Sequence, residues 1–278
     1  MVMSPVVHDS LPSAIEVTNS VAQTFSLAIR FLPGPLRDDV YLLYLVVRTL
    51  DDLVDLQQPE AHNRLEQVVT WAEYEGATTG REEAILEYLF EKYPAMPRDA
   101  VTDFCIGQLD ELSAACIETE EDLDLHAYRV AGTVGRLMAG MLGVTCPDAL
   151  VRAKALGIAM QRTNILRDID EDLARGRIYI PRETLDAVKI GDLACDDRSD
   201  LLLAEIAIAD RWYDEGLSGT AYLVHGGWQV RAAGLMYREI LRELERDGLG
   251  RIRPRRVSVS AHRKLWLVTR AALQRSSG

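Results

Sequence analysis

The chain has 278 residues, 48% of them hydrophobic and 27% charged, which is the composition of an ordinary globular protein. Its formal net charge is −12, whereas a protein that grips nucleic acid needs a basic face, so we expect no nucleic-acid partner. The same negative charge opposes strong attraction to anionic lipid headgroups. No Gly-, Ser- or Pro-rich linker divides the chain, and we therefore expect a single domain covering residues 1–278.

Four cysteines are scattered along the chain without a CxxC pair, which is typical of reduced thiols in a cytoplasmic protein. The first residues include no basic segment that leads into an apolar one, so we expect no signal peptide. The longest apolar stretch, around residues 40–50, is too short to span a bilayer. The sequence therefore predicts a soluble, cytoplasmic protein.

Helical periodicity runs through nearly the whole chain, and sustained alternation of polar and apolar residues is absent. Pro33-Gly34-Pro35 separates the first two predicted helices, and Pro147 suits a first helical turn, where a missing N–H costs nothing. Gly176 and Pro181 end the long helix that precedes them. The sequence predicts an all-α fold. Its helices cover approximately residues 13–31, 36–56, 59–74, 81–91, 97–117, 121–142, 147–174, 198–216, 228–247 and 257–274.

A first aspartate motif lies near the end of the second predicted helix. Tyr44, Arg48, Asp51 and Asp55 are spaced i, i+4, i+7 and i+11, which places them on one helical face, and Asp52 flanks that face. The rest of this helix is apolar on nearly every side, so we expect it to be buried. Carboxylates four residues apart repel each other, and burying them without compensation is costly. The motif therefore indicates a nearby cation.

A second aspartate motif follows the same logic in the helix predicted over residues 147–174. Gln161, Asn164, Asp168 and Asp172 form one stripe at steps of three and four residues, with arginines around its edges. Oxygen ligands at this spacing suit a hard cation such as Mg²⁺, which bridges carboxylates to phosphate oxygens. A lone DxxxD on a helix is usually a solvated face. Two of them, each in an apolar or amide-bearing context, favour a common site.

The chemistry that this pair of motifs predicts is the departure of a diphosphate. Arg48, Arg167 and Arg177 are the candidate donors to its oxygens. Mg²⁺ would neutralise the charge that develops on the departing pyrophosphate. What remains is an allylic carbocation, which needs a dry and unreactive cavity to survive.

A third segment has small residues on one predicted helical face, formed by Tyr128, Gly132, Gly135 and Ala139. Glycine inside a helix costs about 1 kcal/mol relative to alanine, so two on one face indicate that something lies close to it. Substrate is one interpretation, and a tight contact with another helix is at least as good. Tyr128 could bring a hydroxyl group near the diphosphate or a π face near a cation.

These segments resemble the squalene/phytoene synthase family. The stretch from Phe31 to Asp55 is similar to the family's first aspartate motif, and the stretch from Tyr128 to Gly135 to its Tyr-x-x-Val-Ala-Gly-x-Val-Gly signature. The stretch from Gln161 to Pro181 is similar to its most specific signature. The resemblance implies a single-domain isoprenoid synthase helical bundle around a central cavity. It also implies head-to-head condensation of two farnesyl or geranylgeranyl diphosphates to phytoene or to a presqualene- or squalene-type product.

The resemblance also implies roles for individual residues, with Mg²⁺ as the cofactor and Mn²⁺ as an alternative. The implied metal ligands are Asp51, Asp52, Asp55, Asn164, Asp168 and Asp172. The implied catalytic residues are Asp51, Asp55, Asp168, Asp172, Tyr44, Arg48 and Tyr128. The implied substrate-binding residues are Arg48, Gln161, Asn164, Arg167, Arg177, Tyr179, Gly132 and Gly135.

The chain also departs from the family pattern, with Arg129 in place of a usual cysteine and Arg162 inside the Gln-x-Thr-Asn motif. It has no Gly-rich dinucleotide fingerprint, so the sequence does not support NADPH as a cofactor. Two alternatives stay open: a terpene cyclase that ionises and cyclises one prenyl diphosphate, and a non-catalytic protein that kept the fold. Only four Phe and four Trp lean against cyclisation, although ten Tyr weaken that argument. Peripheral contact of the protein with a membrane is a further expectation, because the hydrocarbon product is strongly hydrophobic.

Overall fold

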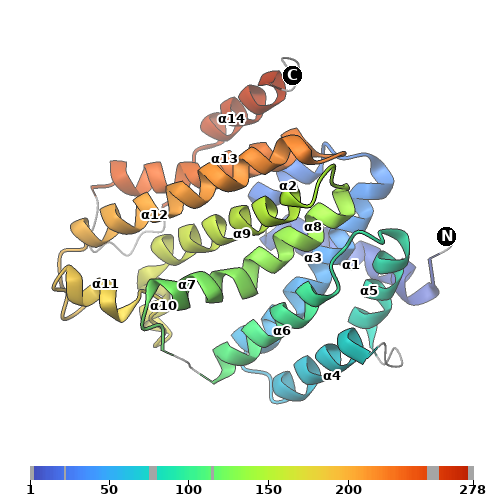
Figure 1. The fold of residues 1–278 in the computed structure, drawn as a ribbon, viewed down its shortest axis with the longest axis horizontal. Coiled ribbons are helices and arrows are strands. Elements are labelled where there is room, and N and C mark those ends of the chain that lie inside the picture. The colour runs from blue at the N-terminus through green and yellow to red at the C-terminus, as the bar shows by residue number, and fades with distance from the viewer. Residues whose placement is uncertain (1–2, 22, 75–79, 114–115, 249–256, 275–278) are drawn as a thin grey trace.

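The computed structural model describes residues 3–21, 23–74, 80–113, 116–248 and 257–274. Within these ranges helices joined by turns and loops make up the chain (Figure 1). The β-structure there is limited to an isolated bridge between Val144 and Leu223. The prediction of an all-α fold is confirmed. In chain order the first elements are α1 (Pro5–Val21), α2 (Gln23–Ile29), α3 (Gly34–Asp55), α4 (Ala61–Tyr74), α5 (Arg81–Lys92) and α6 (Asp99–Leu112). Next come α7 (Glu120–Ala127), the π-helix η1 (Tyr128–Gly132), α8 (Thr133–Leu142), α9 (Asp148–Arg167), α10 (Ile169–Ala174) and α11 (Arg182–Ala187). The last are α12 (Ser199–Ser218), the 3₁₀-helix η2 (Gly219–Tyr222), α13 (Gly227–Arg246) and α14 (Ala261–Gln274).

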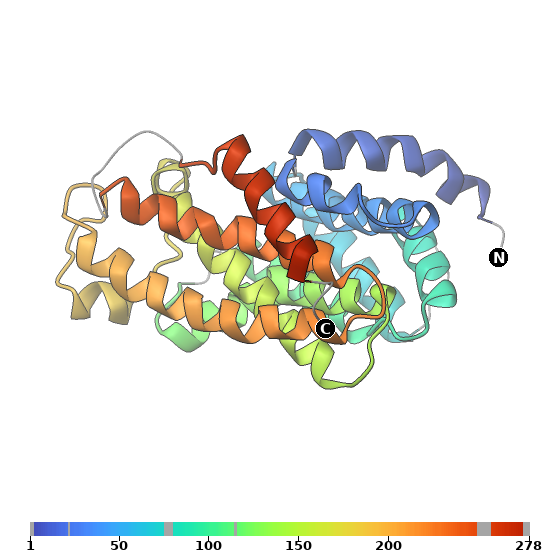
Figure 2. The same ribbon diagram turned by 90° about the horizontal axis from the view of Figure 1, so that it is seen from above.

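The helices form a bundle in which α9 packs against α8, α12 and α13, while α3 packs against α1, α5, α6 and α8. Figure 1 shows α3 and α9 inside the bundle, with α4 at one edge and α14 at the opposite edge. Seen from above in Figure 2, α14 crosses α13 on the outside of the molecule. The two helices that carry the aspartate motifs are therefore inner helices. Among the described residues, no helix is both long enough and apolar enough to cross a membrane.

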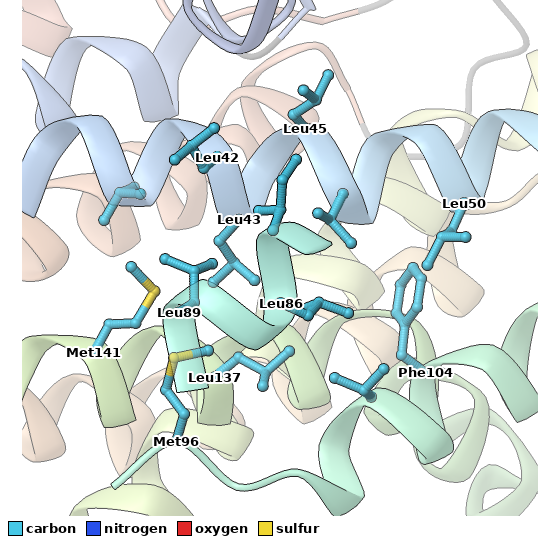
Figure 3. Close-up of a cluster of buried hydrophobic side chains, with 14 of the residues drawn as sticks. Leu42, Leu43, Leu45, Leu50, Leu86, Leu89, Met96, Phe104, Leu137 and Met141 are labelled. Atoms are coloured by element: carbon cyan, nitrogen blue, oxygen red, sulfur yellow. The ribbon is translucent and has the colours of Figure 1, made fainter. Parts of the chain in front are cut away.

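The helix α3 is held in place by a core of aliphatic side chains (Figure 3). Leu42, Leu43 and Leu50 of α3 are at most 1% exposed and pack among apolar side chains of α5, α6 and α8, such as Leu89 and Leu137. Each fully buried leucine contributes about 2 kcal/mol relative to an exposed one. This cluster fixes both the depth and the rotation of the helix that carries the first motif.

A second apolar cluster joins α9, α10, α12 and α13, and it includes Leu156, Leu166, Leu202 and Tyr213. Small residues bring α9 close to its neighbours. A Cβ on Gly216 of α12 would lie 2.5 Å from the Leu156 backbone nitrogen. The helix that carries the second motif is thus held by close backbone approach as well as by side chains.

Several predicted helices differ from the observed ones in their ends or continuity, and the last, predicted over 257–274, begins at Ala261. The first helix begins at Pro5 rather than near residue 13, and α2 follows it as a separate element. The predicted 121–142 helix contains the π-helix η1, in which the Thr133 N–H donates to the Tyr128 carbonyl. Such a turn inserts one residue, so the face expected from α-helical spacing is rotated there. The predicted 97–117 helix ends at Leu112, and residues 114–115 lie outside the described residues.

The predicted 147–174 helix is interrupted at Asp168, where φ is −105° and ψ is 13°. Hydrogen bonds nevertheless continue across the break, because the Asp168 N–H donates to the Asn164 carbonyl and the Asp172 N–H donates to the Asp168 carbonyl, both at 2.9 Å. The short helix α11 was not predicted. Its six residues are too few for hydrophobic periodicity to indicate a helix.

Candidate active site

The first aspartate motif occupies the last two turns of α3, where helical spacing brings an arginine onto the carboxylates. Arg48 donates to Asp51 at 2.8 Å and also to Asp52. From α6, the Gln108 amide donates to the other Asp51 oxygen at 3.2 Å. Burial, followed by repulsion from Asp55, raises the pKa of Asp51 to about 6. The motif therefore holds more negative charge than its own arginine neutralises.

Tyr44 lies two turns before this motif in α3 and shares its surroundings. Burial is the main cause that raises the pKa of Tyr44 to about 12, and Tyr237 of α13 contributes to the same shift. Tyr237 also interacts electrostatically with Arg167 at the end of α9. One tyrosine thus connects the surroundings of both motifs, and the sequence analysis did not assign it to the site.

The second motif lies where α9 ends and α10 begins. Arg167 makes a two-pronged contact with Asp168, in which Nε donates at 2.7 Å. Burial, followed by repulsion from Asp168, raises the pKa of Asp172 to about 6. The Asn164 amide donates to Gln161 at 3.3 Å, while its buried Oδ1 has no hydrogen-bond partner. That oxygen is a buried acceptor left without a donor.

The two motifs are brought together by residues between them. Arg177, which follows α10, donates to Asp55 of the first motif at 2.9 Å. The same guanidinium lies 3.8 Å from Glu111 of α6. Burial is the largest cause that raises the pKa of Glu111 to about 7, and Asp51, Asp55 and Asp172 all raise it further. Carboxylates from both motifs therefore act on one side chain.

Sequence reasoning missed Gln108 and Glu111, although both lie in the predicted 97–117 helix. Their spacing of three residues puts them on one face of α6, which was the available signal. Periodicity alone does not say which neighbour that face meets. Tyr179, a predicted substrate-binding residue, lies nearby and stacks on His126 with ring centroids 5.1 Å apart. Burial is the main cause that lowers the pKa of His126 to about 4, so this imidazole is neutral.

The structure places Tyr128 at the start of η1. Its hydroxyl donates to Asp103 of α6 and accepts from Arg136 at 2.9 Å, and Lys154 lies 4.7 Å from the ring centroid. These partners belong to neither aspartate motif. The catalytic role of Tyr128 stays a prediction that this geometry does not itself support.

The two glycines that were predicted to bind substrate lie at close contacts between helices. A Cβ on Gly135 would lie 2.3 Å from the Ala153 carbonyl oxygen of α9, a distance that real side chains do not tolerate. A Cβ on Gly132 would meet the Tyr128 ring at 3.0 Å and the Lys154 carbonyl oxygen at 3.2 Å. The alternative of a tight helix contact describes these positions, and the substrate-binding role of the two glycines stays a prediction.

Arg162 lies within the second motif but points away from the aspartates into a buried ionic cluster. Its guanidinium is 1% exposed and donates to Asp124 at 2.8 Å, to Glu205 at 2.9 Å and to Glu120 at 2.8 Å. Those partners belong to α7 and α12, so one side chain fixes α9 against two neighbours. Burial and a hydrogen bond with Glu120 raise the pKa of Glu205 to about 8, and a proton on Glu205 relieves the cluster's excess negative charge.

A divalent metal fits the residues of the two motifs. The donors are hard oxygens, Asn164 has a buried acceptor without a partner, and one aspartate in each motif has a raised pKa. Within the described ranges, no three His, Cys, Asp or Glu side chains are gathered so that they could hold a metal by themselves. The carboxylates are instead engaged by arginines. A metal would therefore require the arginines to turn toward another anion, such as a phosphate.

An all-α bundle with two opposed acidic motifs on inner helices defines an isoprenoid-synthase-like fold. Comparison with known proteins supports this assignment of the fold. The sequence profile described as squalene/phytoene synthase matches residues 18–263. The phytoene synthase of Thermus thermophilus is 35% identical over 264 residues, covering 91% of this chain and 87% of that protein. The phytoene synthase of Arthrospira platensis is 32% identical over 275 residues, covering 86% of this chain and 85% of that protein.

Solved structures give the same result. A dehydrosqualene synthase in complex with a ligand superposes with a TM-score of 0.88 at 25% identity, covering 98% of both chains. The chain belongs to the squalene/phytoene synthase family. It is accordingly an enzyme of the prenyltransferase class, as the sequence indicated.

Proposed function

We propose that this enzyme condenses two prenyl diphosphates head to head in the presence of Mg²⁺ and releases diphosphate. The family relationship supports head-to-head condensation. The observation that carries the finer proposal is the convergence of Asp51, Asp55 and Asp172 on Glu111. Two acidic motifs that act on one side chain suit metal-assisted binding of diphosphate. A terpene cyclase would use both motifs as well, so the preference for condensation over cyclisation rests on the family relationship.

The residues that would hold the metal are Asp51 and Asp55 on one side and Asn164, Asp168 and Asp172 on the other. Bound Mg²⁺ supplies Lewis-acid stabilisation of the leaving diphosphate. The chain's own contribution is a set of arginines placed beside these carboxylates, with Arg48 on the first motif and Arg167 on the second. When a diphosphate arrives, these guanidinium groups bind its oxygens, and the aspartates become free for the metal.

The remaining neighbours orient the diphosphates and exclude water. Arg177 reaches Asp55 from beyond α10, and it is therefore placed to span the two diphosphates. Tyr44 keeps its proton at neutral pH, because burial raises its pKa, and it presents a hydroxyl group rather than a charge.

We further propose geranylgeranyl diphosphate as the substrate and phytoene as the product. The support is that the relatives in Thermus, Arthrospira and Synechocystis, each at least 32% identical to this chain, are phytoene synthases. The dehydrosqualene synthase structure makes the shorter farnesyl substrate the alternative. None of these relatives is a terpene cyclase, so the cyclase alternative gains no support from them.

The decisive test incubates purified enzyme and Mg²⁺ with geranylgeranyl or farnesyl diphosphate and identifies the extracted hydrocarbons by mass spectrometry. A product with twice the carbon count of geranylgeranyl diphosphate is expected. A doubled product from farnesyl diphosphate alone would keep the reaction but change the substrate. A ring-containing product with an unchanged carbon count would show a cyclase.

A binding test separates loss of chemistry from loss of the site. The thermal midpoint of the protein is measured with Mg²⁺, with a non-hydrolysable prenyl diphosphate analogue, and with both together. Adding both is expected to raise the thermal midpoint by more than the sum of the separate shifts. The reason is that the diphosphate analogue would draw the arginines away from the aspartates, which could then bind the metal. Purely additive shifts would contradict the exchange of partners proposed for Arg48 and Arg167.

A further inference from the structure

The C-terminal helix α14 differs in charge from the rest of the chain. Residues 248–278 contain eight Lys and Arg and no Asp or Glu, which leaves 23 basic and all 43 acidic residues in residues 1–247. Within α14 itself, Arg263, Lys264 and Arg270 occur without an acidic residue. Charge segregation of this kind indicates a surface that meets an anionic partner.

The inner face of α14 is attached to the bundle. Leu267, Val268 and Ala271 are buried against Ala232 and Met236 of α13. Arg263 adds a two-pronged ion pair with Glu239 of α13, at 3.0 and 3.1 Å. The helix is therefore a fixed part of the fold, and its orientation determines which residues face outward.

The outer face of α14 exposes large apolar side chains, which is unusual for a helix that already buries another face. Leu265 is 66% exposed, Trp266 is 47% exposed and Leu273 is 67% exposed. Positions 265 and 273 are two turns apart on one face, and position 266 lies beside them. Two guanidinium groups flank the indole, with Arg263 at 4.4 Å and Arg270 at 5.5 Å from the ring.

An open pocket of about 920 Å³ lies beside α14, between the start of α3 and the start of α13. Ala271 on the inner face of α14 lines this pocket together with Phe31, Val224 and Trp228. Phe31 and Val224 are themselves about half exposed, and Phe31 packs on Trp228 with ring centroids 5.4 Å apart. The pocket rim thus adds exposed apolar side chains next to α14.

We infer that the outer face of α14, formed by Leu265, Trp266, Leu273 and Arg270, docks on the surface of an anionic lipid bilayer. Leucine and tryptophan with flanking arginines are the composition of helices that lie in the membrane interface. Lys264 and Arg270 of α14 match an anionic leaflet, whereas the acidic remainder of the chain is repelled by it and stays in water. Three exposed apolar side chains suit shallow insertion and are few for a stable protein interface. The choice of a lipid partner rests in part on the proposed function, since prenyl substrates and products partition into bilayers.

The test is sedimentation of the full-length protein with vesicles of phosphatidylcholine, alone or mixed with phosphatidylglycerol, without metal or substrate. Binding is expected only to the mixed vesicles, and it should weaken at high salt. Leu265→Ser should abolish most of it, while Leu203→Ser, which alters a 49% exposed leucine on α12, should leave it intact. Arg270→Gln should weaken binding about fivefold, the effect of one cation at an anionic surface.

Trp266 offers a second measurement, because it is the tryptophan whose side chain the structure places in the exposed class. Its emission should shift to the blue with mixed vesicles, and Trp266→Phe should remove that shift. Absence of binding, or binding that Leu265→Ser leaves unchanged, would overturn the proposal. Self-association that Leu265→Ser abolishes, without vesicle binding, would overturn it in favour of a second copy of the chain. Because no substrate is present, a failure here is distinct from a failure of the condensation assay.

Discussion

Both helices that carry the aspartate motifs pack in apolar clusters, and they differ in where their buried ion pairs lie. Asp39 of α3 pairs with Lys92 of α5 at 2.7 Å, three turns before the motif, whereas Arg162 of α9 lies within the motif segment. Hydrocarbon packing surrounds α3, where Leu42, Leu43 and Leu50 lie in an aliphatic core. A buried ionic cluster around Arg162 fixes α9 to α7 and α12. Apolar packing tolerates small changes of shape and does not depend on pH, whereas an ionic cluster requires every partner and every proton.

This difference bears on the site, because each motif must keep its carboxylates at a set distance from the other. Arg162 adjoins Gln161 in sequence and points to the opposite side of α9, so its bonds set the rotation of the helix that presents Asn164 and Asp168. In α3 the same task falls to the leucines on the faces away from Asp51. Substitutions in each helix test this difference between α3 and α9.

The largest expected effect is on turnover. Asp51→Ala and Asp168→Ala should each reduce condensation about a thousandfold or more, since Lewis-acid stabilisation of the leaving group contributes several kcal/mol. The far-ultraviolet circular dichroism of both variants should stay helical. Near-normal hydrocarbon formation by either variant would contradict the metal-binding role proposed for that motif.

The next largest effect is on stability. Arg162→Met should lower the free energy of unfolding by about 3–5 kcal/mol, because it removes the cation shared by Glu120 and Asp124 and leaves the buried Glu205 without its hydrogen-bond donor. Urea denaturation measures this change in the free energy of unfolding. The double variant Arg162→Met with Glu205→Leu should recover part of the lost stability.

Leu43→Ala in α3 provides the matched comparison, with an expected loss of about 2–5 kcal/mol from a cavity. No second substitution in the ionic cluster should rescue that variant. If Arg162→Met proved neutral, the ionic cluster would not be what holds α9.

A smaller effect is expected where α8 meets α9. Gly135→Ala should cost about 1–3 kcal/mol, since its Cβ would collide with the Ala153 carbonyl oxygen and the backbones would have to separate. Gly34→Ala is the control, because a Cβ there meets nothing within 4 Å. Equal denaturation midpoints for the two variants would show that the contact is not tight.

The ionic cluster also predicts a pH dependence that the aliphatic core around Leu43 does not share. The pKa of Glu205 is raised to about 8 in the folded state, so its stabilising proton is fully present at low pH and is lost as pH rises through that value. Glu205→Gln cannot lose a proton. The thermal midpoint of Glu205→Gln should therefore rise relative to that of the wild type as pH increases from about 6 to about 8. The expected change is about 2–4 °C for each kcal/mol of stability that the wild type loses. Leu43→Ala should show a constant offset over the same range, and a constant offset for Glu205→Gln would contradict the assignment.

Much of the fold could be read from the chain, because long amphipathic helices leave a strong period in the sequence. The family was also recognisable, since its motifs are local. The helix boundaries at Tyr128 and Asp168 were not predicted, because a π-turn and a helix break change hydrogen bonding without changing composition. Arg162 was visible only as a departure from a motif, since its partners lie 38 to 43 residues away along the chain.

The sequence by itself determined the all-α class, the family and the spacing of Asp51 and Asp55, because each depends on helical periodicity within one segment. Tertiary structure alone decided that Glu111 lies among carboxylates of both motifs, that Arg177 reaches Asp55, and that Gly132 of η1 and Gly135 of α8 face α9. The physical reason is that periodicity says which residues share a face. Only packing, which sums many weak contacts between distant segments, says what that face meets.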